Sequence, residues 1–347
     1  MKILHTADIH LGVKNSRLPK DKQALLKDET IYNIRNLFEI AERECYDVVL
    51  ICGDLFHAKN IASKFSKAFF DAVEKFEKPV IYVSGNHDEN FIMPLILPKN
   101  FVVIDENNQC FSYGNFNFYG GIYENWGELD SSKSNIILLH GNIENTRDCD
   151  YFDINKYLNK GFDYIALGHV HTHKKYKSEN DVFAYPGSLF SNGFDECGDR
   201  GYISLEMQDK TIKTLNFCPF SARKFVICEC NISNLTKNRE IIELIEKKLM
   251  DLNANYQDLV RVILKGAVSE DCDKSIPFIL SRFDTYFHFE IEDKTTLKID
   301  IDNIKKEKLS FKYEFISLIE ESELDEESKR IVCEIGLEAL KGEDINL

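Results

Sequence analysis

Five short apolar stretches, each followed at once by side chains able to bind metals, constrain this 347-residue chain more than any other feature. Continuous apolar runs of this length, separated by helical patterns, are typical of strands buried on both faces of an α/β sheet. Side chains that follow such strands gather beyond the carboxyl ends of the sheet. The predicted strands are residues 2–7, 47–52, 79–84, 135–140 and 163–168, and the polar residues that end or follow them include Asp8, His10, Asp54, His57, Asn86, His87, Asp88, His140, His169 and His171.

This set of side chains predicts a metal centre. Imidazole, carboxylate and amide groups without a thiolate suit manganese, iron or zinc. One ion cannot use so many ligands, whereas two ions about 3.5 to 4 Å apart can, and enzymes that hydrolyse phosphate esters use that arrangement. Asp54, on a central strand, is the best candidate for a bridging carboxylate. The glycines before Asp54, Asn86 and His169 allow the chain to turn sharply and to approach the ions. His5, alone on an apolar strand, is expected to be a core residue.

The rest of the chain predicts further elements around these strands. Apolar stripes at helical spacing predict helices over residues 31–41 and 65–76, and Pro79 blocks continuation of the second. Residues 110–121 predict a hairpin that turns at Gly114-Asn115, and residues 200–217 predict another. A boundary is expected in residues 218–225. The predicted domains, of α/β (α+β) class, are residues 1–218, a small α/β domain over 223–300, and a helical segment over 301–347.

Charge and composition limit the classes of partner. The formal charge of −15 means that any contact with nucleic acid must be local or shared with a partner. Two basic stretches, 14–22 and 173–177, offer Lys14, Arg17, Lys174 and Lys175 as candidate substrate contacts. The ten scattered cysteines are expected to be reduced thiols. No apolar run reaches the roughly 20 residues of a membrane span, and the start is no signal peptide. We therefore expect a cytoplasmic protein that has no membrane partner.

The order of the polar motifs resembles the calcineurin-like metallophosphoesterases, whose blocks are D-x-H, G-D, G-N-H-[DE], H and G-H-x-H. All five blocks are present in that order. Within the superfamily, HTADIHLG, GDLFH, GNHD and ALGHVH resemble the SbcD- and YhaO-type DNA-repair nucleases, as do residues 185–202. The resemblance covers residues 1–215 well. It implies a four-layer sandwich with two central mixed sheets flanked by helices, a small capping domain that recognises DNA, and C-terminal helices.

The resemblance also implies a role for each matching residue. It places Asp8, His10, Asp54 and His171 on a first ion, and Asp54, Asn86, His140 and His169 on a second. It makes His87 the catalytic histidine near the leaving group, oriented by Asp88, and it gives His57 a part in placing the DNA strand. The family prefers Mn2+, with Fe2+, Zn2+ or Mg2+ as alternatives. His173 matches no ligand and is expected to be solvated or on the substrate side.

The activity implied by the resemblance is that of a DNA exonuclease and single-strand endonuclease in repair and recombination. Such nucleases form homodimers, act at the nucleoid, and bind an SbcC-like SMC-family ATPase through a C-terminal helical segment. In this chain, residues 301–347 could equally cap the second domain. Two other functions stay open: a phosphoesterase that acts on nucleotides or phosphoproteins through the same metal centre, and a scaffold or DNA-binding subunit with a vestigial centre. The motif GDLFH and the domain after residue 218 favour the nuclease.

Overall fold

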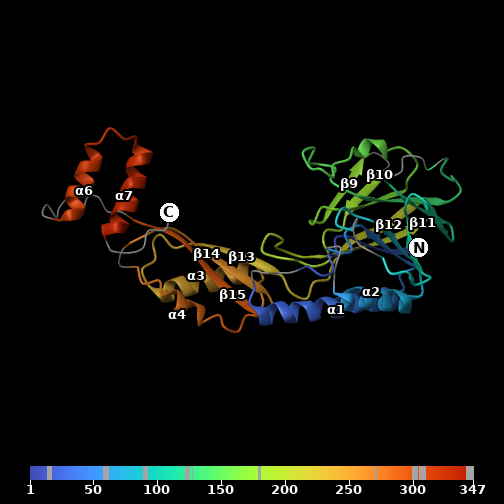
Figure 1. The fold of residues 1–347 in the computed structure, drawn as a ribbon, viewed down its shortest axis with the longest axis horizontal. Coiled ribbons are helices and arrows are strands. Elements are labelled where there is room, and N and C mark those ends of the chain that lie inside the picture. The colour runs from blue at the N-terminus through green and yellow to red at the C-terminus, as the bar shows by residue number, and fades with distance from the viewer. Residues whose placement is uncertain are drawn as a thin grey trace. The chain divides into compact units, whose positions relative to one another are not determined.

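The computed structural model describes residues 1–13, 18–57, 62–88, 93–121, 126, 128–178, 181–269, 272–298, 304 and 310–340. The chain divides into two compact units, Met1–Phe225 and Val226–Leu347. In Figure 1 the first unit runs from blue to yellow and the second from yellow to red. The ten cysteines all lie in the described part of the chain and carry thiols outside any disulfide, as expected for reduced cysteines. Within the described residues, no helix is both long enough and apolar enough to cross a membrane.

Two mixed six-stranded sheets form the first unit, which confirms the predicted fold class. Their strands are β1 (Lys2–Thr6), β2 (Val48–Cys52), β3 (Val80–Val83), β4 (Phe101–Val103), β5 (Cys110–Tyr113), β6 (Phe116–Gly120), β7 (Ser134–His140), β8 (Tyr164–Gly168), β9 (Lys174–Ser178), β10 (Asp181–Tyr185), β11 (Gly201–Gln208) and β12 (Thr211–Pro219). The first sheet has the order β12-β11-β1-β2-β3-β4, and the second has the order β5-β6-β7-β8-β10-β9. Pairing is parallel in the middle of each sheet, as between β1 and β2 or β7 and β8.

The five predicted strands are confirmed, but they are divided between the two sheets. Strands β1, β2 and β3 lie in the first sheet, and β7 and β8 lie in the second. One apolar core contains buried side chains from both, such as Leu50 and Ile81 of the first sheet and Ile136 and Leu138 of the second. The sheets therefore pack face to face, which brings the ends of strands from two sheets, rather than one, to the same place.

Helices cover the outer face of the first sheet. They are α1 (Lys20–Arg43) and α2 (Ser63–Phe76), and their apolar stripes bury Leu37, Phe38, Phe69 and Val73 against that sheet. Helix α1 begins eleven residues before the predicted stripe, because its first turns are mostly polar and partly exposed. The outer face of the second sheet is covered by loop side chains and a 3-10 helix, η1 (Ile154–Lys156). Both predicted hairpins are present, as β5–β6 and β11–β12.

The second unit contains a three-stranded sheet and helices. Its elements are β13 (Phe225–Asn231), α3 (Asn238–Asp251), β14 (Leu259–Val268), α4 (Ile276–Leu280), β15 (His288–Leu297), α6 (Phe311–Glu320) and α7 (Glu326–Leu340). The sheet has the order β13-β14-β15, and Ile241, Ile245 and Leu249 of α3 lie in its core. Helices α6 and α7 share a separate small core that includes Ile316 and Leu337.

Candidate metal centre

The turns after β1 and β2 hold three of the candidate ligands in place by backbone hydrogen bonds. The N–H of Asp8 donates to the carbonyl of Gly53 at 3.1 Å, and the N–H of His10 donates to the carbonyl of Asp54 at 2.9 Å. The last residue of β7, His140, and the loops after β3 and β8, with Asn86, His169 and His171, add the remaining four. Five of the seven form two groups, Asp8-His10-His171 and Asp8-Asp54-His140, in each of which the potential ligand atoms lie within 4.8 Å of one another, whereas His169 groups instead with Asp148 and Asp150.

The backbone of four candidate ligands is in an unusual conformation. Asp8, His10, Asp54 and His169 have φ angles of +50°, +48°, +52° and +102°. Residues other than glycine rarely adopt positive φ, and such positions cluster at functional sites. The turns thereby direct side chains from strand ends inward, which an extended continuation of each strand would not do.

The first group is centred on His10. Its Nε2 lies 3.1 Å from Nε2 of His171 and 3.6 Å from Oδ2 of Asp54. Burial, followed by the neighbouring His171, lowers the pKa of His10 to about 2, so its ring is neutral near neutral pH. Burial raises the pKa of Asp8 well above its usual value. A buried carboxyl group beside two imidazole nitrogens that face each other is a donor set that fits a divalent cation.

The second group is centred on His140. Its Nε2 lies 3.5 Å from Oδ1 of Asp54 and 3.0 Å from Oδ1 of Asn86, while its Nδ1–H donates to the carbonyl of Cys52 at 2.9 Å. Burial lowers the pKa of His140. The two oxygens of Asp54 therefore face different histidines, Oδ2 toward His10 and Oδ1 toward His140. This is the geometry that a bridging carboxylate requires.

Two glycines allow the close approach of these loops. A Cβ at Gly85 would lie 2.2 Å from Oδ1 of Asp54, and a Cβ at Gly168 would lie 1.7 Å from the carbonyl oxygen of Cys52. Any side chain at either position would push the ligand loops apart. The glycines before Asn86 and His169 are therefore required for the packing around the centre.

His57 and His87 lie beside the first group. Their rings stack with centroids 5.4 Å apart, and the ring of His87 lies 5.0 Å from that of His10. His87 is exposed, His57 is half-buried, and burial lowers the pKa of His57. His87 is held by its backbone, whose N–H donates to Oδ1 of Asp54 at 3.0 Å. An imidazole that is reachable from solvent and close to candidate ligands is suited to proton transfer.

Asp88 has a different set of contacts from the predicted one. The resemblance implies that it orients His87, but its carboxylate accepts backbone N–H groups instead: Leu55 at 3.1 Å, Phe56 at 2.8 Å and Gly85 at 3.0 Å. Asp88 thus ties the loop after β2 to the loop after β3. It positions the strand ends that carry Asp54 and Asn86, and its part in orienting His87 stays a prediction.

The candidate substrate contacts are only partly described. Lys14 and Arg17 lie outside the described residues. Lys174 pairs with Glu144, and Lys175 is exposed on the edge strand β9. His173 stacks on Phe217 with ring centroids 4.7 Å apart and hydrogen-bonds to the carbonyl of Tyr185, so it packs against the sheets rather than standing in solvent.

His5 is a core residue, as expected from its place on an apolar strand. It is fully buried and hydrogen-bonds to the hydroxyl of Tyr164 and to the carbonyl of Leu167. Its ring therefore belongs to the packing between the two sheets.

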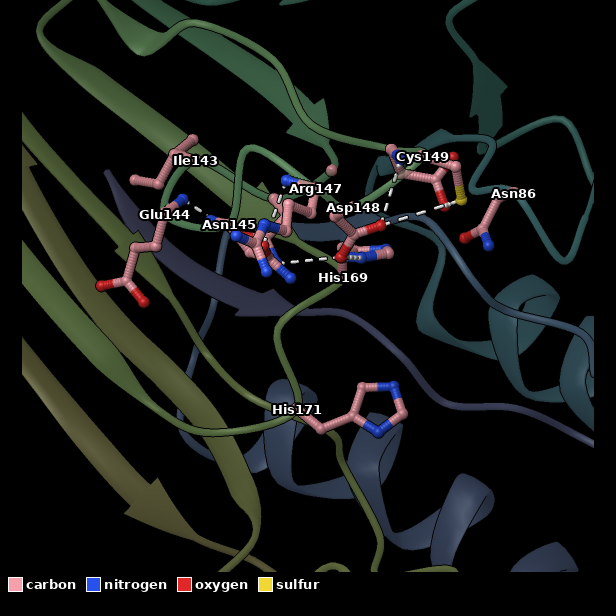
Figure 2. Close-up of polar contacts among 12 residues, drawn as sticks. Asn86, Ile143, Glu144, Asn145, Arg147, Asp148, Cys149, His169 and His171 are labelled. Carbon is pink, nitrogen blue, oxygen red and sulfur yellow. Dashed lines mark hydrogen bonds and ion pairs between the residues drawn. The ribbon is translucent and has the colours of Figure 1, made fainter.

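Two carboxylates beside the ligands were missed in the sequence. Oδ2 of Asp148 lies 3.2 Å from Nε2 of His169, and Oε1 of Glu196 accepts a hydrogen bond from Nδ1 of His171. Figure 2 shows Asp148 next to the ring of His169, with His171 pointing elsewhere. Asp148 carries no motif. Glu196 lies within residues 185–202, the segment that resembles the nuclease family, and this resemblance is the sequence feature that could have pointed to Glu196.

Comparison with known proteins gives one family and several relatives. The sequence profile of the calcineurin-like phosphoesterases matches residues 1–173. The chain is 25% identical over 303 residues to the uncharacterized metallophosphoesterase YhaO of Bacillus subtilis, covering 78% of this chain and 73% of YhaO. It is 24% identical over 288 residues to the SbcD component of the nuclease SbcCD of Staphylococcus epidermidis, covering 69% and 75%. It is 27% identical over 281 residues to the DNA double-strand break repair protein Mre11 of Methanocaldococcus jannaschii, covering 71% and 74%.

Proposed function

Because the chain carries a calcineurin-like metallophosphoesterase domain, we propose that it is a two-metal phosphodiesterase that cleaves DNA, as exonuclease and single-strand endonuclease, with Mn2+ as its preferred ion. One observation carries the proposal. Asp54 presents one oxygen to His10 and the other to His140, so two ions can share it. The two relatives from nuclease and DNA-break-repair systems, SbcD and Mre11, support DNA as the substrate.

Each side chain in the centre then has a chemical task. When bound, two divalent ions supply an activated water near neutral pH and stabilise charge on the phosphoryl oxygens. Asp8, His10, Asp54 and His171 would hold the first ion, and Asp54, Asn86, His140 and His169 would hold the second. His87 gives a proton to the departing ester oxygen, for which an exposed imidazole is suited. His57, stacked on His87, contacts the DNA strand, and Lys174 and Lys175, with Lys14 and Arg17, bind the substrate.

The test of this function uses several phosphate esters under the same conditions. End-labelled single- and double-stranded DNA, a chromogenic phosphodiester and a chromogenic phosphomonoester are incubated with the full chain in Mn2+ or in EDTA. We expect Mn2+-dependent cleavage of DNA, and none by Asp54→Asn prepared in parallel, which controls for contaminating nucleases. If the small esters are hydrolysed and DNA is left intact, the alternative phosphoesterase is correct. If nothing is hydrolysed, the vestigial scaffold is correct.

We propose further that an SbcC-like SMC-family ATPase docks on residues 301–347, and that the protein acts as a homodimer on nucleoid DNA in the cytoplasm. The side chains of Phe311 and Leu318 on α6 are 83% and 68% exposed, whereas Ile316 and Leu337 fill the core between α6 and α7. The pair of helices thus has a core of its own and exposed apolar side chains besides. This favours docking over a role confined to capping the second domain.

Truncation tests the docking segment. A chain that ends at residue 305 is expected to lose copurification with the ATPase while keeping its two metal ions, because the candidate ligands all precede residue 172. The substitution of both Phe311 and Leu318 by serine removes only exposed apolar area. Like the truncation, it should weaken binding of the ATPase. Undiminished binding by the truncated chain would eliminate this segment as the docking site.

A further inference from the structure

We infer that Asp148 and Glu196 are positioning residues that orient the two histidines of the GHVH motif, Asp148 acting on His169 and Glu196 on His171. The inference rests on the two-metal centre of the proposed function and extends it beyond the ligands themselves. Imidazole ligands usually donate their second ring N–H to a carboxylate or carbonyl, which fixes the ring and its tautomer. Here the two partners come from different loops, one for each ion.

Asp148 is held ready for this contact by its own loop. It lies in the segment between β7 and β8, eight residues after His140. Its Oδ1 accepts the backbone N–H of Asp150 at 3.1 Å, and its Oδ2 accepts Nδ2–H of Asn142 at 3.0 Å as well as Nε2–H of His169 at 3.2 Å. Figure 2 shows the dashed contacts that converge on this carboxylate.

Asn142 in turn fixes the turn that carries Asp148. Its side-chain oxygen accepts the backbone N–H groups of Glu144 at 2.9 Å and Asn145 at 3.0 Å. Its own backbone exchanges hydrogen bonds with Asp150 and Phe152. Asp148 is therefore presented to His169 by a closed network, and the contact does not depend on a freely rotating surface side chain.

Glu196 is held in a comparable way next to His171. Its side chain is 11% exposed, its Oε1 accepts Nδ1–H of His171, and its Oε2 accepts the backbone N–H of Asn192 at 2.8 Å. Arg200, also buried, donates to the carbonyl of His171 and to the carbonyl of Glu196. The segment after β10 thereby clamps both the ring and the backbone of His171.

These contacts determine which ring nitrogen of each histidine is left for an ion. With Nε2 of His169 on Asp148, its Nδ1 is available, and with Nδ1 of His171 on Glu196, its Nε2 is available. Nε2 of His171 is the atom that lies 3.1 Å from Nε2 of His10, in the first group. The two GHVH histidines thus offer opposite ring atoms, so two histidines that lie two positions apart on one loop can serve two ions.

Titration of the metal-free full chain with Mn2+ by calorimetry tests the inference without any assay of activity. Wild type is expected to bind two ions. Asp148→Asn and Glu196→Gln are each expected to weaken one of the two by about 10- to 100-fold and to leave the other unchanged. Asp153→Asn and Asp195→Asn remove exposed charges from the same segments, and both should bind as wild type does.

A double variant separates positioning from general structural support. In a His169→Ala background, Asp148→Asn should cause no further loss of Mn2+ affinity, because the ring it orients is absent. A further loss in that background, or two wild-type affinities in both single variants, would overturn the inference. Glu196→Gln could fail to fold because that side chain is buried. Asp148 is partly exposed, so the titration of Asp148→Asn tests the inference in that case too. Absence of DNA cleavage would contradict the proposed substrate without changing these titrations.

Discussion

His87→Ala is expected to bind two Mn2+ ions like the wild type and to cleave DNA about 100- to 10,000-fold more slowly, the usual contribution of a positioned acid. The structure gives the reason for this separation. His87 contacts the candidate ligand Asp54 through its backbone N–H, which alanine retains, and its exposed ring lies against the rings of His10 and His57. Single-turnover cleavage at saturating Mn2+, with metal content measured on the same sample, gives both quantities.

His173→Ala is the matched control for this experiment. It removes an imidazole of the same region that stacks on Phe217, and it should leave both the metal content and the rate unchanged. Undiminished Mn2+-dependent cleavage by His87→Ala would remove His87 from the chemistry. A loss of bound metal in that variant would instead make it a ligand.

Asp54→Asn is expected to release both ions together and to reduce cleavage below detection. The amide can keep Oδ1, which accepts the backbone N–H of His87 and faces His140, but it loses the negative charge and replaces Oδ2, the oxygen that faces His10, with an NH2 group. Bridging requires both oxygens, so the affinities for the two ions should fall together. Loss of a residue that only supports a ligand costs roughly 10- to 100-fold in metal affinity, and the loss here should be at least as large for each ion. Metal content after dialysis, together with calorimetric titration, measures this effect.

The stoichiometry of the Asp54→Asn variant distinguishes a bridge from a simple ligand. Loss of one ion with normal retention of the other would contradict the bridging role, although the centre would survive as a metal site. Asp71→Asn, which removes an exposed carboxylate of α2, should bind two ions and shows that charge removal alone does not produce the effect.

The sequence predicts the parts of this centre that depend on local order along the chain. The ligands follow apolar strands directly, so their convergence follows from strand ends alone, and His5 is a core residue for the same local reason. What it could not predict depends on contacts between distant loops. The carboxylate of Asp88 accepts hydrogen bonds from the backbone N–H groups of Leu55 and Phe56, which lie 33 and 32 positions earlier in the chain. Asp148 contacts His169, which lies 21 positions later. Periodicity shows which residues are buried, but it does not say that three strands belong to one sheet and two to another.

The left-handed backbone of Asp8, His10, Asp54 and His169 has a consequence for the stability of the whole sandwich. A residue other than glycine in the left-handed conformation destabilises the fold by roughly 1 to 2 kcal/mol. The free energy of unfolding of a whole domain is only about 5 to 15 kcal/mol. Ions that bind these residues would join the turns of the first sheet, after β1, β2 and β3, to those of the second, after β7 and β8. The metal centre is then a cross-link between two sheets. On this basis, we expect a chelator to lower the free energy of unfolding of the sandwich as well as to abolish its hydrolytic activity.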